Sequence, residues 1–157
     1  MTDCAGQMSD ADHARLSEIA LLPGDSGQCY VQSRWNAFET SLRNTAVHIR
    51  ALKQKREPGA YIREETDAFG GLETHVQDAL SHNPLGMEEH LDNVRWQFLD
   101  NLLVGREFTF DALAVYKIKL LLLEKRAGAD SKQGAETLEQ FLNEKLTSDQ
   151  LPEFING

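Results

Sequence analysis

The sequence contains little cysteine, little proline and no excess of positive charge, and these shortages exclude several classes of protein. Its 157 residues include only two cysteines, Cys4 and Cys29. Two cysteines without a CxxC pair build neither a disulfide framework nor a zinc knuckle, so we expect free thiols. The formal net charge of −9 at pH 7 opposes binding to nucleic acid or to an anionic membrane surface, because both would repel the chain.

Long apolar runs are missing as well. The longest purely apolar run covers residues 120–123, whereas a membrane-spanning helix needs about 20 apolar residues. The first residues, from Met1 to Cys4, carry neither the basic nor the apolar region of a secretion signal. We therefore expect a soluble, cytoplasmic protein that does not insert into a membrane and that reaches one only peripherally, through a complex.

What the sequence does contain is helical periodicity. Its four prolines are Pro23, Pro58, Pro84 and Pro152, and between them apolar residues recur every three or four positions. This spacing predicts an all-α fold, a bundle of five to six helices. We expect one helical domain over residues 1–157, with residues 1–8 and 147–157 mobile. The helices are predicted at about 10–22, 31–55, 64–81, 84–104, 109–127 and 133–146.

Two of these helices are expected to build most of the core. The second is long and carries an apolar stripe, and the fifth is apolar nearly all round over residues 113–123, as buried helices are. Leu120→Ala or Tyr116→Ala should therefore destabilise the protein strongly. The predicted structural core comprises Trp35, Phe38, Leu42, Trp96, Phe98, Leu113, Tyr116 and Leu120.

Two arginines lie beside the apolar stripes, Arg43 on the second helix and Arg95 on the fourth. An arginine at the edge of a core usually pairs with a carboxylate of a neighbouring helix. Glu39 and Asp100 are the nearest candidates along the chain. We favour a structural role for both arginines.

Motifs of catalysis are weak. Gly24-Asp25-Ser26-Gly27 matches the tetrapeptide around the nucleophile of trypsin-like proteases. That chemistry needs a histidine, an aspartate and an oxyanion hole built by β-barrels, which a helical chain does not supply, so we interpret the motif as a turn. Neither Gly-x-x-x-x-Gly-Lys-Ser/Thr nor Gly-x-Gly-x-x-Gly occurs.

The five histidines also lack a metal-binding pattern of the di-iron type, because no Glu-x-x-His occurs. Glu88, Glu89, His90 and Asp92 are dense in ligand types, but adjacent helix positions point apart. We therefore predict no catalytic, cofactor-binding or metal-binding residue. A metal-dependent enzyme that uses residues 82–92 is the weakest alternative.

A basic stretch covers residues 43–63. Its ordinary explanation is a solvated face, and its functional alternative is a surface for an acidic helical partner, with apolar residues flanked by cations. A competing interpretation is that the third helix folds back and covers the apolar strip. The predicted partner-binding residues are Arg43, Ile49, Arg50, Leu52, Lys53 and Arg56.

Several short motifs carry a family resemblance. They are Trp35-x-x-Phe38-Glu39-x-x-Leu42-Arg43-Asn44, Asn83-Pro84-Leu85 and Arg95-Trp96-x-Phe98-Leu99-Asp100. Over about residues 30–145 the chain resembles a bacterial family of unassigned function that is encoded beside V/A-type rotary ATPases. Members of that family are similar to the helical central-stalk subunit that seats the rotor shaft on the membrane ring.

The resemblance implies a non-enzymatic helical subunit or accessory factor of a V/A-type ATPase that translocates protons or sodium ions, with rotor or stalk subunits as partners. The alternative is a stand-alone regulatory or adaptor protein that binds an acidic helical partner. Neither hypothesis needs a cofactor or nucleic acid, and both leave open a homo-oligomer.

The protease-like tetrapeptide generates a first prediction. If Gly24-Asp25-Ser26-Gly27 is a turn, Ser26→Ala should change neither the stability nor any activity of the protein, and the purified chain should hydrolyse neither peptides nor nucleotides. Labelling with a serine-directed phosphonate, followed by mass spectrometry, checks this. A covalent adduct on Ser26 would show that the turn interpretation is wrong.

Overall fold

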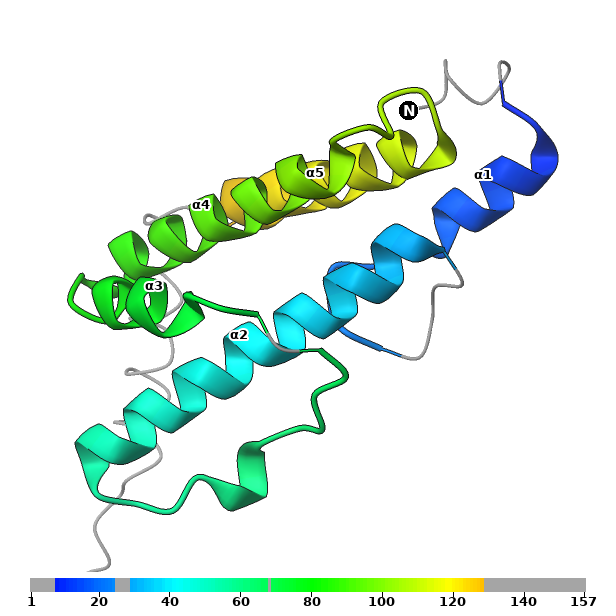
Figure 1. Ribbon diagram of the computed structural model, residues 1–157. Coiled ribbons are helices and arrows are strands. Elements are labelled where there is room, and N and C mark those ends of the chain that lie inside the picture. Colours follow the sequence, from blue (N-terminus) through cyan, green and yellow to red (C-terminus); the bar gives the residue numbers. More distant parts are fainter. Residues whose placement is uncertain (1–7, 25–28, 68, 129–157) are drawn as a thin grey trace, which may run out of the picture. The chain divides into compact units, whose positions relative to one another are not determined.

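The computed structural model describes residues 8–24, 29–67 and 69–128. The chain divides into two compact units, Met1–Leu122 and Leu123–Gly157, and only residues 123–128 of the second unit are described. The described residues contain helices and turns but no strand, which confirms the predicted all-α class. The elements are α1 (Asp10–Ser17), α2 (Tyr30–Gln54), the short 3₁₀ helix η2 (Gly59–Tyr61), α3 (Leu72–Ala79), α4 (Pro84–Leu103) and α5 (Phe110–Gly128) (Figure 1).

Local capping sets the first residues of two helices. At α1, the Ser9 hydroxyl accepts a hydrogen bond from the Asp12 backbone N–H at 3.1 Å and donates one to the Asp12 carboxylate at 2.8 Å. At α4, the Asn83 side-chain oxygen accepts from the Gly86 N–H at 2.8 Å, and Pro84 occupies the first helical position. Both arrangements satisfy N–H groups that a helix start leaves unpaired, so both starts were predictable from the sequence.

The long helix α2 has marked ends as well. At its start, the free and buried thiol of Cys29 accepts a hydrogen bond from the Gln32 N–H at 3.4 Å. At its end, Lys55 adopts the left-handed conformation with φ 55°, and its N–H bonds back to the carbonyls of Ala51 and Leu52. This left-handed cap is the usual way to end a helix, although glycine is the residue that most often forms it.

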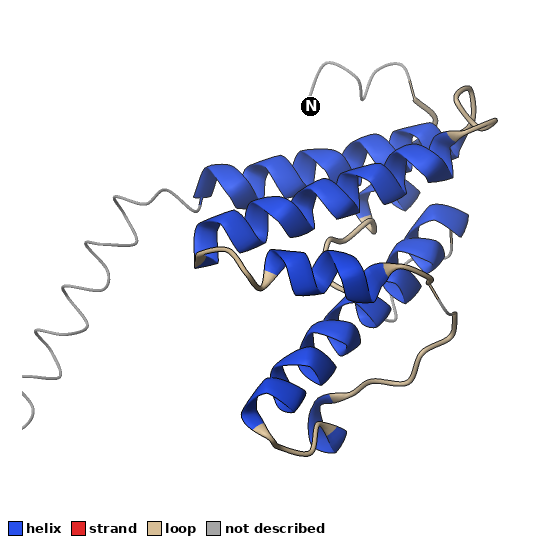
Figure 2. Cartoon of the chain, turned by 60° about the vertical axis from the view of Figure 1, so that its left-hand side comes forward, coloured by secondary structure: helices blue, strands red, loops and turns tan. Residues whose placement is uncertain are grey.

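The third helix is shorter than predicted. Only Leu72–Ala79 is α-helical, and it begins directly after Gly71, whose φ of 81° favours glycine. Residues 62–67 and 69–71 instead belong to a segment that runs back beside α2 (Figure 1 and Figure 2). The Asn44 side chain explains this course, because it accepts from the Arg63 N–H at 3.0 Å and donates to the Arg63 carbonyl at 2.7 Å. These bonds replace those that a helix over this segment would make.

The core lies where α2 packs against α3 and α4. The rings of Phe38 and Phe98 stack with centroids 3.9 Å apart, and Phe69 meets both edge-on at 5.5 Å. Trp35 is fully buried, and its indole N–H donates to the Leu21 carbonyl at 2.9 Å. Trp35, Phe38 and Leu42 are therefore core residues as predicted, and Phe98 and Trp96 are half-buried against them.

The fifth helix, predicted to be buried, is partly buried. Leu113 and Tyr116 are 39% and 58% exposed, so neither is a core residue, and Leu120 is half-buried. One face of α5 is buried, with Ala114, Val115, Ile118 and Leu122. The physical reason is that an apolar composition does not reveal whether a helix has neighbours on one side or on all sides.

Some predictions lie outside the described residues: the sixth helix at 133–146, the turn at 25–27 and the mobile ends at 1–7 and 147–157. One domain over the whole chain therefore stays a prediction. Within the described part, no helix combines the length and apolarity needed to cross a bilayer.

The two faces of α5 generate a matched pair of variants. Ile118→Ala should lower the free energy of unfolding by about 2–5 kcal/mol, because it removes a fully buried side chain and leaves a cavity. Tyr116→Ala removes an exposed ring from the same helix and should change stability by less than about 1 kcal/mol. Urea denaturation of both variants checks this. Equal losses would contradict the one-sided burial of α5.

Candidate partner-binding surface

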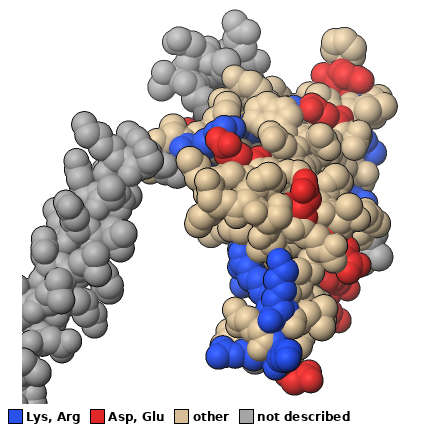
Figure 3. Space-filling model, turned by 90° about the vertical axis from the view of Figure 1, so that its left-hand side faces the viewer, with Lys and Arg blue, Asp and Glu red and all other residues tan. Residues whose placement is uncertain are grey.

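The C-terminal part of α2 and the turn that follows it form an exposed basic surface. Arg50, Lys53, Lys55 and Arg56 are all exposed there, and Figure 3 shows Lys and Arg side chains gathered where α2 ends. Because this chain is acidic as a whole, the local excess of positive charge is a specific feature of this end of the helix. We call these four residues the basic end of α2.

The four cations predicted to bind a partner divide into two groups. Lys53 and Arg56 have no carboxylate partner among the described residues. Arg50, in contrast, reaches α4, where its Nη2 lies 3.5 Å from the sulfur of Met87. Arg43 pairs with Glu39 at 3.1 Å. Of these four, Arg43 alone is neutralised by a carboxylate of the described residues, and Arg50 keeps its charge although it contacts Met87.

The apolar residues of this surface divide in the same way. Ile49 is only 6% exposed, which corrects its prediction as a contact residue, because the fold itself buries it. Leu52, one turn further on, is 75% exposed and fits the prediction of an accessible apolar side chain. The third helix packs against α2, as the competing interpretation expected, and Ile49 lies in the same apolar cluster as Leu72 and Val76.

A groove of about 450 Å³ lies between this part of α2, the returning segment and the start of α3. Ile49 and Leu52 line it from α2, and Leu72 from α3. Ser41, Thr45 and His48 of α2 line it as well, and two acidic residues face them, Glu65 from the returning segment and Glu73 from α3, so the wall mixes apolar and polar groups. The groove is large enough to receive an apolar side chain from outside, and Leu52 stands at the junction between the groove and the basic end.

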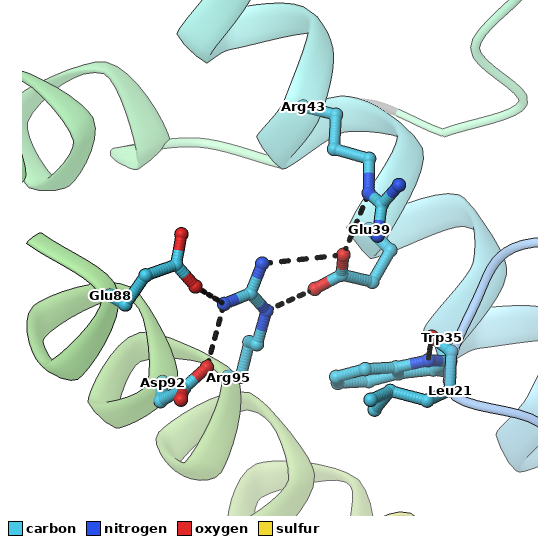
Figure 4. Close-up of polar contacts among 7 residues, drawn as sticks. All are labelled: Leu21, Trp35, Glu39, Arg43, Glu88, Asp92 and Arg95. Carbon is cyan, nitrogen blue, oxygen red and sulfur yellow. Dashed lines mark hydrogen bonds and ion pairs between the residues drawn. The ribbon is translucent and has the colours of Figure 1, made fainter. Parts of the chain in front are cut away.

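Arg43 belongs to a buried cluster of charges that joins α2 to α4. Glu39 is 1% exposed and receives hydrogen bonds from Arg43 and from Arg95, whose Nε and Nη2 both reach its carboxylate (Figure 4). Asp92 also accepts from Arg95, at 2.7 Å, and Glu88 lies 3.9 Å away. The prediction that Glu39 pairs with the arginines is correct, whereas Asp100 pairs with Lys119 at 2.6 Å instead.

The carboxylates keep Arg95 charged in this buried position. Burial by itself lowers the pKa of Arg95, but the charge of Glu39 and the hydrogen bonds from Arg95 to Glu39 and Asp92 outweigh that effect and raise the pKa above its ordinary value. Arg95 therefore stays protonated and neutralises Glu39. The cluster holds α2 and α4 together and is not suited to proton transfer.

Sequence reasoning identified only part of one group of side chains, because the region 82–92 that it considered for a metal contains His82 and His90 but not Asp78. Asp78, His82 and His90 come together at the turn between α3 and α4. Their spacing, Asp78-x-x-x-His82 and then eight positions to His90, was visible in the sequence, but only the turn at Asn83 shows that the two helices bring them to one place. Asp92, from the same predicted region, pairs with Arg95 and is not part of the group.

Comparison with known proteins identifies a family without an assigned function. The sequence model of the family described as Protein of unknown function (DUF2764) matches residues 66–148. No curated protein and no solved structure matches. The finding agrees with the coarser part of the predicted resemblance, and the described part of the chain shows no catalytic constellation.

The buried cluster generates a prediction about stability. Glu39→Leu should lower the free energy of unfolding by about 3–5 kcal/mol, because it leaves Arg95 buried without its main counter-charge. The double variant Glu39→Leu with Arg95→Met removes both charges and should lose less than the single variant. A double-mutant cycle from urea denaturation measures the difference. If the two variants are equally unstable, the pair does not couple α2 to α4.

Proposed function

The chain belongs to this family of proteins of unknown function, and we propose that it is a non-enzymatic helical component that binds an acidic helical partner through the basic end of α2. The observation that carries the proposal is the cluster of exposed cations without a carboxylate partner in the described part of the chain, Lys53 and Arg56 among them, beside the exposed Leu52. The other two predicted cations, Arg43 and Arg50, make contacts inside the protein.

The side chains of this surface suit a contact between α2 and a helix of the partner. An apolar side chain buried at such a contact contributes about 1.5–3 kcal/mol, and charged side chains at its rim mainly accelerate association and select the partner. Leu52 would supply the buried contact. Lys53 and Arg56 would select a partner that carries Asp or Glu on the adjoining face.

The groove beside Leu52 extends this contact. A partner helix lying along α2 could place one apolar side chain against Ile49 and Leu72 at the groove floor while its acidic face meets the basic end. Glu65 and Glu73 on the opposite side of the groove would repel an acidic residue placed there. The arrangement therefore orients the partner, with its acidic residues toward the C-terminus of α2.

We further propose that the partner is a helical rotor or stalk subunit of a V/A-type ATPase, and that this chain acts in a manner similar to the central-stalk subunit that seats the rotor shaft. The resemblance of its motifs to a family encoded beside such ATPases supports this choice. In that setting the protein would hold an assembly together or transmit torque through packed helix faces, and no catalytic residue of its own would be needed.

The alternative function, a stand-alone adaptor, uses the same surface. It is favoured if the partner that accompanies the protein is acidic and helical but belongs to no ATPase. Affinity purification from the native host, with mass spectrometry of the accompanying proteins, distinguishes the two functions.

The test of the surface is a charge reversal, Lys53→Glu with Arg56→Glu. These residues are exposed and have no carboxylate partner among the described residues, so the fold should survive, while the co-purifying partner should be lost. The matched control is Lys125→Glu with Arg126→Glu, which makes the same change of net charge on α5. Circular dichroism confirms that both variants fold.

Two outcomes would contradict the proposal. If the variant of the basic end retains the partner and its oligomeric state, α2 is only a scaffold. If both variants lose the partner equally, the effect comes from net charge and not from this surface. Binding of the partner to the unaltered protein that weakens with added salt would support a contact made by charges.

A further inference from the structure

Side chains from α3, the following turn and α4 converge at a second place in the molecule. Asp78 lies in the last turn of α3, His82 in the turn, and His90 in α4. One ligand atom of each residue lies within 4.8 Å of the other two. The rings of His82 and His90 have their centroids 6.0 Å apart, and His75 brings a third ring to 6.3 Å from His90.

The environment of His90 is not explained by the packing around it. Its Nε2 is shielded from solvent and has no hydrogen-bond partner among the described residues. A carboxylate oxygen, Oδ2 of Asp78, lies 3.6 Å away, which is beyond hydrogen-bond distance. A shielded polar atom without a partner destabilises a fold, and a cation between Nε2 and Oδ2 would bond to both.

The separations suit a small divalent cation. Zinc–nitrogen bonds of about 2.0–2.1 Å at tetrahedral angles place neighbouring ligand atoms roughly 3.4 Å apart. The His90–Asp78 separation of 3.6 Å is already close to this value. Asp78 and His82 are exposed, so their side chains can rotate toward His90 without a change of the backbone.

We propose that Asp78, His82 and His90 form a binding site for a divalent transition-metal cation, with Zn²⁺ as the best match. Two imidazoles and one carboxylate are a ligand set that Zn²⁺ takes in proteins, with water in the fourth position. Mg²⁺ and Ca²⁺ prefer oxygen ligands only, so the two histidines select against them.

The ion would cross-link α3 and α4. Its ligands come from the end of one helix, the turn and the second turn of the next helix, so binding fixes the angle at which the two helices meet. The groove beside α2 is lined by other residues, so the ion would lie outside it. Because a cation that binds only the folded state stabilises it, the ion should raise the melting temperature.

The test uses the full chain after treatment with a chelator and desalting. Titration with ZnCl₂ in a calorimeter should show one equivalent bound, and Co²⁺ should give the visible absorption bands of a tetrahedral site. His82→Ala and His90→Ala should each weaken Zn²⁺ binding by at least about tenfold. Zn²⁺ should raise the melting temperature of the wild type but not of these variants.

Two histidine variants serve as matched controls. His75→Ala removes the neighbouring ring outside the ligand set, and His13→Ala removes a histidine of α1, so both should retain the wild-type affinity. If His90→Ala does not fold, the exposed His82 carries the test alone. Zn²⁺ binding that is unchanged in His82→Ala, or lost equally in His75→Ala, would overturn the proposed ligand set.

Discussion

The buried ion pair between Glu39 and Arg95 is the interaction on which the arrangement of the helices depends. It joins residues 56 positions apart in the chain and connects the middle of α2 to the middle of α4. A charge in this position tolerates little displacement, because moving either helix would leave it buried and unpaired. The stacked rings of Phe38 and Phe98 lie on the same two helices, so polar and apolar contacts fix the same helix pair.

The packing of α2 against α4 determines which cations of α2 remain exposed to a binding partner. Arg95 and Arg43 are committed to Glu39, and Arg50 contacts Met87 of α4. The cations without a carboxylate partner in the described residues are thus gathered at the C-terminal end of α2 and in the turn after it, at Arg50, Lys53, Lys55 and Arg56. A surface of this kind arises when a helix is longer than the body it packs against, since its last turns then carry side chains that the fold does not use.

Features that depend on residues close together in the chain were predictable from the sequence. Features that depend on contacts between residues far apart in the chain were not. Ser9 and Asn83 cap their helices through partners three positions away, so α1 and α4 start where predicted. The shortening of α3 depends on Asn44, which binds Arg63 from 19 positions away, and no local pattern indicates that bond. The exposed face of α5 and the group around His90 likewise follow from which elements meet. The partner-binding residues were only partly predictable, because exposure of Leu52 and burial of Ile49 are properties of the folded chain.

The short helix α3 has a further consequence for how the protein moves. It has eight residues, and Gly71, which precedes it, has no side chain to cap it, so by itself it is far below the length at which a helix is stable in water. Its order depends on contacts with α2 and α4, and its amide hydrogens should exchange through local openings that leave the long helices intact. Leu72, Val76 and Ala79 of α3 belong to the core, and Leu72 also lines the groove, so a ligand that holds this segment closed would order core contacts and the groove together.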